Sequence, residues 1–462
     1  MAHSDKIDRH TCHAFINDNV FAVRRQPDYQ DKVGVEIETI PILNSTAPVP
    51  FISNEPSAKQ LRPLLHELAI AENWVSTFDD HDPYTLDSLR IELGVAGHLT
   101  FEPAAQIEYS SPPVASITPL RKHTDAILHK LTSHLAAHSI SLIQLGINPW
   151  HTVEQLGLQV KKQHYLMMQK HFKLHAPIGL RMMRQTCATQ INLDYGNNDQ
   201  TLVKRYLACL LLAPYSAAIF ANSTVWDQTN SDCLGFRSRI WQTADASRTG
   251  FPTLTGLFDK TSKQSLVASY VEFAINAKVI ALVNDTRLSG ATFSDWLDAD
   301  LPHRPTLADF QTHLRTLFPE VRPQGYFELR SVDAQAPVWQ YVPLGFYLGL
   351  VYSDSSVEQV LARLAPAWQA TETQMHRAAQ GLRARDSQFI ATAKWLFDLA
   401  INASLPHHWL DTRVQRAMQC FAERFTYQEK TPADEINNIF TASGHFTPND
   451  LRALTMEWEK LL

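Results

Sequence analysis

Four short segments of the chain alternate polar and apolar residues, the pattern of a strand with one polar and one buried face. In the first segment, Glu36 and Glu38 alternate with Val35 and Ile37. An ordinary solvated face carries Lys, Thr, Ser and mixed charges, whereas these polar faces carry mostly acids and amides with one arginine. The four segments are residues 33–40, 106–110, 189–195 and 326–331. The pattern predicts a sheet with one ligand-binding face.

The polar residues of these segments are ligands for cations and phosphates. They are Glu36, Glu38, Gln106, Glu108, Gln190, Asn192, Asp194, Glu328 and Arg330, with Glu102 just ahead of the second segment. If the strands pair, the five glutamates converge and repel one another unless cations compensate. Mg²⁺ prefers oxygen ligands and typically links carboxylates to substrate phosphates. We therefore predict a cation-rich active site on the sheet.

The rest of the chain shows mainly helical periodicity. It predicts helices at 57–70, 119–138, 200–222, 264–283 and 306–317, a short strand at 142–147 and a loop-rich segment at 224–252. After about residue 355 the pattern is helical only, with turn signals at Leu405-Pro406, Thr431-Pro432 and Thr447-Pro448. Because no flexible linker precedes this region, we predict a catalytic domain at 1–354 and a helical region at 355–462 that packs on it.

Composition narrows the class of protein. The chain has 462 residues, a formal net charge of −6 and 19% charged residues, which argues against a nucleic-acid binder. The longest apolar stretch, 206–221, is too short to span a bilayer comfortably and contains Pro214, so it predicts a buried helix and no membrane span. The N-terminus lacks an apolar signal core.

Cysteine usage indicates a reducing compartment. The five cysteines are widely spaced and include no Cys-x-x-Cys pair, which favours reduced thiols and a cytoplasmic location. The cluster His10-Thr-Cys-His13 has no matching second pair of ligands, so we do not expect a structural zinc site there.

Phosphate-binding loops and hydrolase motifs are absent from the sequence. It contains no Walker or dinucleotide Gly-rich loop, no His-Glu-x-x-His and no Gly-x-Ser-x-Gly, so side chains and metal ions would have to bind phosphate. The segment 235–250 offers Arg237, Arg239 and Arg248 with Asp245. These arginines could clamp an anionic substrate or form surface pairs with Asp245, and spacing alone leaves both readings open.

Taken together, the segments resemble the glutamate–cysteine ligase family, specifically its plant and proteobacterial branch with the related actinobacterial enzymes of the ergothioneine pathway. The motifs include Val-Gly-Val-Glu-Ile-Glu, Thr-Phe-Glu-Pro-Ala-Ala-Gln-Ile-Glu-Tyr-Ser and Tyr-Phe-Glu-Leu-Arg-Ser-Val-Asp. The matching stretches follow the family's order at 33–38, 100–110, 145–150, 182–194, 220–223, 237–250, 326–333 and 342–352.

The resemblance implies an α+β, glutamine-synthetase-like fold, in which an antiparallel sheet forms a funnel with helices on its outer face. It implies an ATP-dependent carboxylate–amine ligase of glutathione biosynthesis that uses two or three Mg²⁺ ions. The γ-carboxylate of glutamate would attack the γ-phosphate of ATP, and an amine would then displace phosphate from γ-glutamyl phosphate. Cysteine is the favoured acceptor, and the oligomeric state is not implied.

The resemblance also implies roles for individual residues. Catalytic roles fall to Arg237, Glu328 and Arg330, and Arg330 is expected to stabilise the transferring phosphoryl group. The implied metal ligands are Glu36, Glu38, Glu102, Glu108, Gln190 and Glu328. The implied substrate and ATP contacts are Gln106, Gln190, Asn192, Arg237, Arg239, Trp241, Asp245, Arg248, Tyr326 and Arg330.

Two motifs depart from the family pattern. The usual Glu-Pro-Gly-Gly-Gln is Glu102-Pro-Ala-Ala-Gln106 here, and the Arg-Thr-Cys of the plant enzymes is Gln185-Thr186-Cys187, with Arg184 one place earlier. Two alternatives therefore stay open beside cysteine ligation. One is a γ-glutamyl ligase with a different amino acid or amine as acceptor, and the other is a non-catalytic relative.

Overall fold

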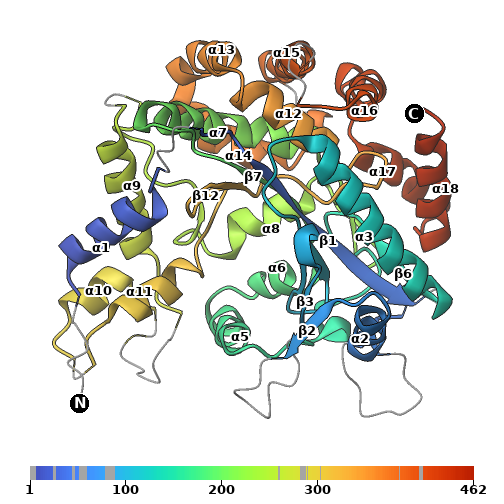
Figure 1. The fold of residues 1–462 in the computed structure, drawn as a ribbon, viewed down its shortest axis with the longest axis horizontal. Helices are drawn as coiled ribbons and strands as arrows, with labels where there is room; N and C mark the ends of the chain where they lie inside the picture. Colours follow the sequence, from blue (N-terminus) through green and yellow to red (C-terminus); the bar gives the residue numbers. More distant parts are fainter. Residues whose placement is uncertain are drawn as a thin grey trace.

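A nine-stranded sheet with antiparallel pairing runs through the middle of the protein in this computed structural model (Figure 1). Eight strands lie in the order β12-β13-β7-β1-β5-β4-β3-β2, and β6 pairs with the far end of the long strand β1. The strands are β1 (Val33–Leu43), β2 (Val75–Phe78), β3 (Leu89–Glu92), β4 (His98–Phe101), β5 (Ile107–Ser110), β6 (Ile140–Ile143), β7 (Thr189–Leu193), β12 (Val321–Pro323) and β13 (Phe327–Leu329). The short pairs β8 (Val225–Trp226) with β9 (Thr229–Asn230) and β10 (Thr249–Gly250) with β11 (Phe318–Pro319) lie outside it.

The four segments predicted from alternation are four neighbouring strands, β13, β7, β1 and β5. Their apolar residues enter the core: Val35, Ile37, Ile191 and Leu329 are all buried. A one-residue shift in register would turn every carboxylate into this core, so the apolar positions fix which side chains face the ligand side.

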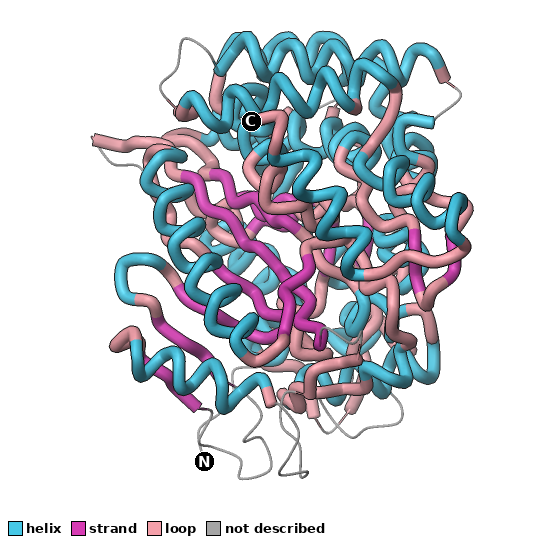
Figure 2. The backbone as a smooth tube through the Cα atoms, turned by 90° about the vertical axis from the view of Figure 1, so that its right-hand side faces the viewer, coloured by secondary structure: helices cyan, strands magenta, loops and turns pink. Residues whose placement is uncertain are grey.

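Helices surround the sheet on several sides, and the predicted α+β class is confirmed (Figure 1). Figure 2 shows the strands running obliquely through the middle of the molecule with helices stacked above them. The helices before residue 352 are α1 (Arg9–Phe15), α2 (Leu61–Ala71), α3 (Ile117–Ala137), α4 (Val153–Leu156), α5 (Gln163–His175), α6 (Gly179–Gln185), α7 (Asp199–Ile219), α8 (Phe236–Ala244), α9 (Lys263–Asn276), α10 (Phe293–Asp298), α11 (Leu307–Leu314) and α12 (Val342–Val351). The structure describes residues 7–23, 28–43, 47–50, 60–78, 89–258, 261–280, 288, 290–301, 303–383, 386–404 and 409–462.

The region after residue 352 is helical throughout the part that the structure describes. Its helices are α13 (Asp354–Leu364), α14 (Thr371–Ala378), α15 (Ser387–Ser404), α16 (Thr412–Arg424), α17 (Pro432–Ser443) and α18 (Pro448–Glu459). The two Thr-Pro signals are helix starts, because Thr431 and Thr447 are N-caps that form capping boxes. Leu405-Pro406 lies outside the described residues. Trp458 belongs to the same buried cluster as Ile37, so this region shares the sheet's core. The boundary at residue 355 stays a prediction.

Three expectations about local structure need correction. Residues 236–244 form helix α8 inside a segment expected to be a loop, the strand expected at 142–147 is β6 at 140–143, and the helix expected to reach 283 ends at Asn276. Residues 281–283 lie outside the described part. The buried helix expected at 206–221 is confirmed by α7, which is long and apolar enough to cross a membrane but is 94% buried inside the protein.

Candidate active site

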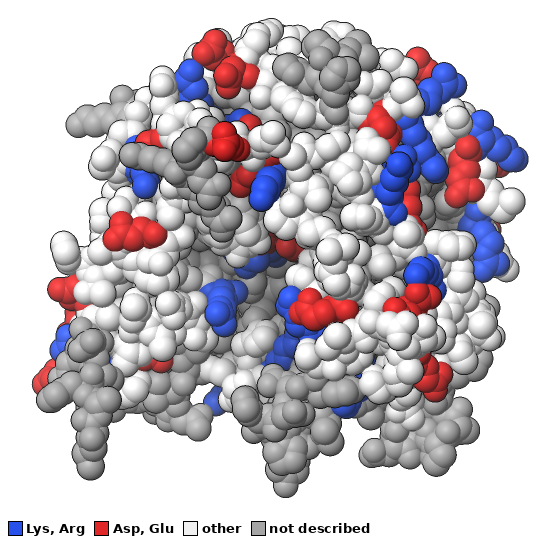
Figure 3. Space-filling view, in the orientation of Figure 1, with Lys and Arg blue, Asp and Glu red and all other residues white. Residues whose placement is uncertain are grey.

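A cavity of about 860 Å³ opens over the polar face of β13, β7, β1 and β5. Its size falls within the usual range for small-molecule sites, about 300–1,000 Å³. In Figure 3 the face toward the viewer is hollowed near its centre, with side chains of both charge signs around the hollow. The predicted site residues that line the cavity are Glu36, Glu38, Glu102, Gln106, Glu108, Gln190, Asn192, Arg237, Trp241, Tyr326, Glu328 and Arg330.

Strand register brings the carboxylates together. Glu38 lies directly opposite Glu108 in the β1–β5 pair, and Glu36 lies opposite Gln190 in the β1–β7 pair. Glu328 lies opposite Asn192 in the β13–β7 pair. Because side chains directly opposite each other are about 5 Å apart at Cβ, acids from segments almost 300 residues apart in sequence become neighbours.

The loop that carries Glu102 keeps a tight turn despite its two alanines. Ala105 has φ +67°, the left-handed conformation that favours glycine, and its N–H donates to the carbonyl of Glu102 over 2.9 Å. Gln106 stabilises this turn, since its Oε1 accepts from Ala104 N at 2.9 Å and its Nε2 donates to the carbonyl of Thr186 at 3.2 Å. This turn therefore holds an alanine in a left-handed conformation, at a cost of about 1 kcal/mol relative to glycine. Gln106 lines the cavity, and its amide holds the loop.

Amide groups hold the two glutamates of β1. Glu38 accepts from Ala188 N at 2.8 Å and from Gln190 Nε2 at 3.0 Å, and Glu36 accepts from Asn192 Nδ2 at 3.0 Å. These donors orient each carboxylate, but because they are neutral amide groups they do not neutralise its charge.

Glu328 differs from the other acids because two guanidinium groups neutralise it. Arg322 binds both of its oxygens, with Nη2 at 2.8 and 2.6 Å, and Arg330 donates to Oε1. Although burial raises the pKa of Glu328, the two arginines bring the net pKa below its usual range. In this structure, Glu328, a predicted metal ligand, is paired with two arginines instead.

Three other acids, Glu36, Glu38 and Glu102, have raised pKa values. Burial, reinforced by the charge of Glu108, raises the pKa of Glu38 to about 7 and that of Glu102 to about 8, and it also raises the pKa of Glu36. Burial disfavours the ionised form, and neighbouring like charges add to the effect. A bound cation would offset both effects, because it stabilises the ionised carboxylates.

These raised pKa values predict that the free energy of unfolding of the metal-free protein falls between about pH 5 and pH 8. In the folded protein, Glu38 and Glu102 keep their protons to about pH 7 and 8, whereas in the unfolded chain they lose them near pH 4.5. The folded state binds more protons in this window, so raising the pH favours unfolding. Thermal unfolding midpoints at pH 5.5 and 8.0, with and without Mg²⁺, provide the measurement. Mg²⁺ should restore stability at pH 8.0, and a Glu38→Gln/Glu102→Gln variant should show a flatter pH dependence. A metal-free protein that becomes more stable across this window would contradict the prediction.

The cavity fits hard cations by the chemistry of its donors. Asn192 Oδ1 is buried without a hydrogen-bond partner, beside carboxylates whose protons a cation would displace. Within the described residues, no three of the five carboxylates bring oxygens within 4.8 Å of one another. Each ion would therefore take one or two carboxylates, as Mg²⁺ usually does when it also binds substrate phosphates.

Two residues that line the same cavity, Arg237 and Trp241, each carry a buried N–H group without a hydrogen-bond partner. Arg237, in the first turn of α8, is anchored by Asp333 at 3.6 Å and donates to the carbonyl of Arg330 at 2.9 Å, while its Nε has no hydrogen-bond partner. The indole Nε1 of Trp241 also lacks a partner. Arg330 lies over the Trp241 ring at 5.1 Å and donates to Gln190 Oε1 at 2.8 Å. Unpaired donors of this kind suit an anionic substrate.

Three predicted substrate contacts lie outside the cavity, and the structure corrects them. Arg248 is completely buried and donates to Asp245 at 2.9 Å and to the Thr316 carbonyl at 3.0 Å. Asp245 also contacts His171 at 3.0 Å. The charges of Arg248 and Asp245 therefore pair with each other inside the protein. Arg239 is exposed on the outer side of α8, where it donates to the thiol of Cys233 at 3.4 Å. None of the three lines the cavity.

Sequence reasoning missed several residues of the site. Arg322 is the most important, and it precedes the last polar strand. Glu320-Val-Arg322 shows the same alternation as Glu328-Leu-Arg330, which is the signal that could have identified it. Tyr165 of α5, whose hydroxyl lies 3.5 Å from Glu102 Oε2, carried no comparable signal. Arg184 and Gln185 point away from the cavity, which Met182, Met183 and Thr186 line instead.

Comparison with known proteins identifies the family of the chain. The model of glutamate–cysteine ligase family 2 matches residues 32–438, most of the chain and all four polar strands. The chain belongs to this family.

The chain is 30% identical over 287 residues to a chloroplastic glutamate–cysteine ligase of Medicago truncatula, covering 60% of this chain and 55% of that protein. It is 26% identical over 355 residues to chloroplastic glutamate–cysteine ligase B of Oryza sativa subsp. japonica, covering 75% of this chain and 66% of that one. The chain thus matches less than two thirds of the length of either relative.

A solved structure shares the fold of this family member. The glutamate–cysteine ligase of Francisella tularensis, solved in complex with AMP, superposes with a TM-score of 0.51 at 11% identity. The match covers 94% of this chain and 90% of that one. At this identity the comparison supports the fold alone.

Proposed function

We propose that this protein is an ATP- and Mg²⁺-dependent γ-glutamyl ligase that forms γ-glutamyl phosphate and transfers the γ-glutamyl group to an amine, with cysteine as the favoured acceptor. The observation that carries the proposal is the cavity face on which Glu36, Glu38, Glu102 and Glu108 gather beside Arg330. Uncompensated carboxylates next to guanidinium groups match the needs of phosphoryl transfer, in which positioning and charge neutralisation lower the barrier.

In the first step, a γ-carboxylate oxygen of glutamate attacks the γ-phosphorus of ATP and ADP leaves. In the second, the amine nitrogen attacks the acyl carbon and inorganic phosphate leaves. Glu36, Glu38, Glu102 and Glu108, with Gln190 and Asn192 beside them, would hold Mg²⁺, which would neutralise charge on the phosphate oxygens. Two or three such ions are proposed, a number that four carboxylates can serve with one or two for each ion.

The arginines take separate roles in this proposal. Arg330 faces the transferred phosphoryl group, since its other contacts, Glu328 and Gln190, hold it at the centre of the polar face. Arg237 and Trp241, which line the cavity and each have one N–H group without a partner, would bind the carboxylates of glutamate. Arg322 keeps Glu328 ionised, so that Glu328 positions Arg330.

Cysteine is favoured by an apolar part of the cavity lining. Met168, Met182 and Met183 line it, and methionine provides an apolar, polarizable surface suited to a small thiol side chain. Other small apolar acceptors would fit the same surface, so the preference among acceptors has to be measured. A cytoplasmic location is proposed on the five free thiols.

The proposal predicts that phosphate release from ATP requires both Mg²⁺ and glutamate, and that addition of cysteine yields γ-glutamylcysteine. A phosphate-release assay with each component omitted in turn tests the first step, and mass spectrometry of products from a panel of amino acids and amines tests the second. Cysteine ranking among the poorest acceptors would move the proposal to a ligase for another amine. A folded protein that binds ATP but releases no phosphate with any acceptor would mark a non-catalytic relative.

A further inference from the structure

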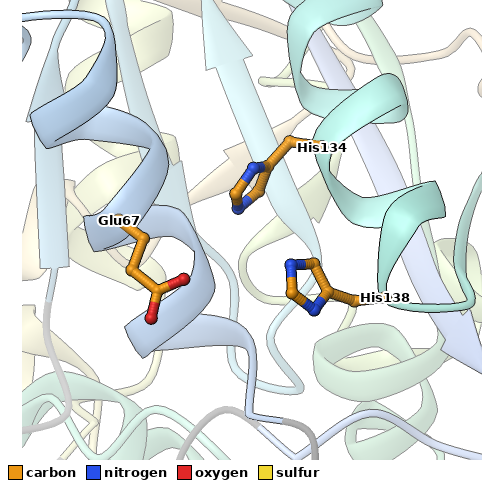
Figure 4. A group of neighbouring side chains, drawn as sticks. All are labelled: Glu67, His134 and His138. Carbon is orange, nitrogen blue, oxygen red and sulfur yellow. The ribbon is translucent and has the colours of Figure 1, made fainter.

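Two helices on the outside of the sheet bring together three side chains that could hold a metal ion. Glu67 of α2 faces His134 of α3 and His138, the C-cap of α3, and one potential ligand atom from each lies within 4.8 Å of the others (Figure 4). In the described part of the chain, this is the only group of three such residues at this spacing. None of the three lines the active-site cavity.

The two helices form a rigid support for these side chains. Their inner faces share one buried cluster, in which Leu64 and Leu68 of α2 pack with Leu131 and Leu135 of α3. An ion pair between Lys130 and Glu72 joins the same two helices. A metal site needs ligands already held close together, because ordering them on binding costs conformational entropy.

The spacing of the histidines is that of a helical metal site. His134 and His138 are four residues apart at the end of α3, with ring centroids separated by 5.3 Å. Residues at i and i+4 share one face of a helix, which is how helical His pairs bind zinc. His134 Nε2 lies 2.8 Å from the carbonyl oxygen of Leu64, which can only accept, so Nε2 carries the proton. Coordination through Nδ1 leaves this bond intact, as in many metal-bound histidines, and coordination through Nε2 exchanges it for a metal bond.

We propose that Glu67, His134 and His138 form a second metal site, which binds a divalent transition metal such as Zn²⁺ and links α2 to α3. Two imidazoles and one carboxylate are a donor set that Zn²⁺ prefers and Mg²⁺ does not, so the site is chemically separate from the carboxylates of the cavity. Zinc bonds of about 2.0–2.2 Å place ligand atoms about 3.4 Å apart, so the three side chains would close by no more than about 1.4 Å. Water would complete the coordination, since these residues supply three ligands.

The test is a Zn²⁺ titration of the full-length protein after chelator treatment, in the presence of excess Mg²⁺ to occupy the cavity. Isothermal titration calorimetry should give one Zn²⁺ per chain. Glu67→Gln, His134→Gln and His138→Gln should each weaken this binding by about 100-fold or more, because losing a direct ligand exceeds the 10–100-fold loss seen for outer-shell partners. Zn²⁺ at a hundredfold excess over its Kd should also raise the Tm of the wild type by about 3 °C and leave the Tm of the double His variant unchanged.

His129→Gln is the matched control, because His129 is an exposed histidine of α3 outside the group. It should bind Zn²⁺ like the wild type. Absorption of the Co²⁺-loaded protein gives a second readout, since its ligand-field bands report nitrogen and oxygen ligands. Zn²⁺ binding that survives in the His134→Gln/His138→Gln variant, or no binding at micromolar Zn²⁺ to the wild type, would overturn the proposal. The titration does not depend on ligase turnover, so its failure leaves the proposed function untouched.

Discussion

Replacing Arg330 with alanine is expected to lower kcat by about 10³-fold or more while changing the KM for glutamate far less. A guanidinium that contacts the transferring phosphoryl group is worth about 10³–10⁵ in rate in comparable enzymes, since it neutralises charge that develops only in the transition state. Arg330→Lys should recover little activity, because an ammonium cannot reproduce the planar contact that spans Gln190 and Glu328. Steady-state kinetics with varied glutamate and ATP provide the measurement.

The control for Arg330 is Arg239→Ala. Arg239 is exposed outside the cavity on α8, so its removal should leave kcat within about twofold of the wild type. The Arg330→Ala protein should stay folded, because Glu328 retains its bidentate contact with Arg322. Partial rescue of Arg330→Ala by added guanidinium would support a direct role for this group. A kcat within tenfold of the wild type would place Arg330 away from the phosphoryl group.

Replacing Glu108 with glutamine is expected to stabilise the metal-free protein and to lower activity at limiting Mg²⁺ by about 100-fold. The charge of Glu108 raises the pKa of Glu36, Glu38 and Glu102, so its removal relieves repulsion among buried acids. The gain in the free energy of unfolding is expected on the order of 1 kcal/mol at pH 8. Glutamine preserves the shape and can still accept from Thr100 Oγ1, which lies 2.9 Å away in the wild type.

Two measurements separate this prediction from a general effect of losing a charge. Thermal unfolding without Mg²⁺ should show a higher midpoint for Glu108→Gln, and a Mg²⁺ titration of activity should show a higher half-saturating concentration. Glu457→Gln is the matched control, since Glu457 is exposed on α18, and neither quantity should change. A Glu108→Gln protein that is less stable without metal would show that Glu108 holds the fold rather than a cation.

Local alternation carried most of the information about the cavity. The apolar partners of Glu36, Glu38, Gln190 and Asn192 had to be buried, which left the polar side chains one face to occupy. The order of the motifs then indicated the family. Glu102 lies outside the alternating segments, so only the resemblance to the family identified it. Its position depends on the tight turn in which Ala105 has a left-handed conformation.

The sequence did not show which arginine of the segment 235–250 faces the cavity. Arg237, Arg239 and Arg248 looked equivalent in a segment expected to be a loop, yet α8 turns Arg237 into the cavity and Arg239 to the outside. Arg248 pairs with Asp245, which was one of the two alternatives for these arginines. The pair lies inside the protein and not on its surface. The helical period of α8 sets the directions of the Arg237 and Arg239 side chains. The segment is too short and polar for its sequence to show that period.

The sequence by itself determined the strands, their ligand-facing sides and the family, because a period of two and the need to bury apolar groups act locally. Only the tertiary structure decided which acid receives which partner. Glu328 is neutralised by Arg322 across a hairpin, while Glu38 and Glu102 remain uncompensated. The cause is physical: the state of a buried charge depends on desolvation and on the charges within a few ångströms, and both are set by segments that meet only after folding.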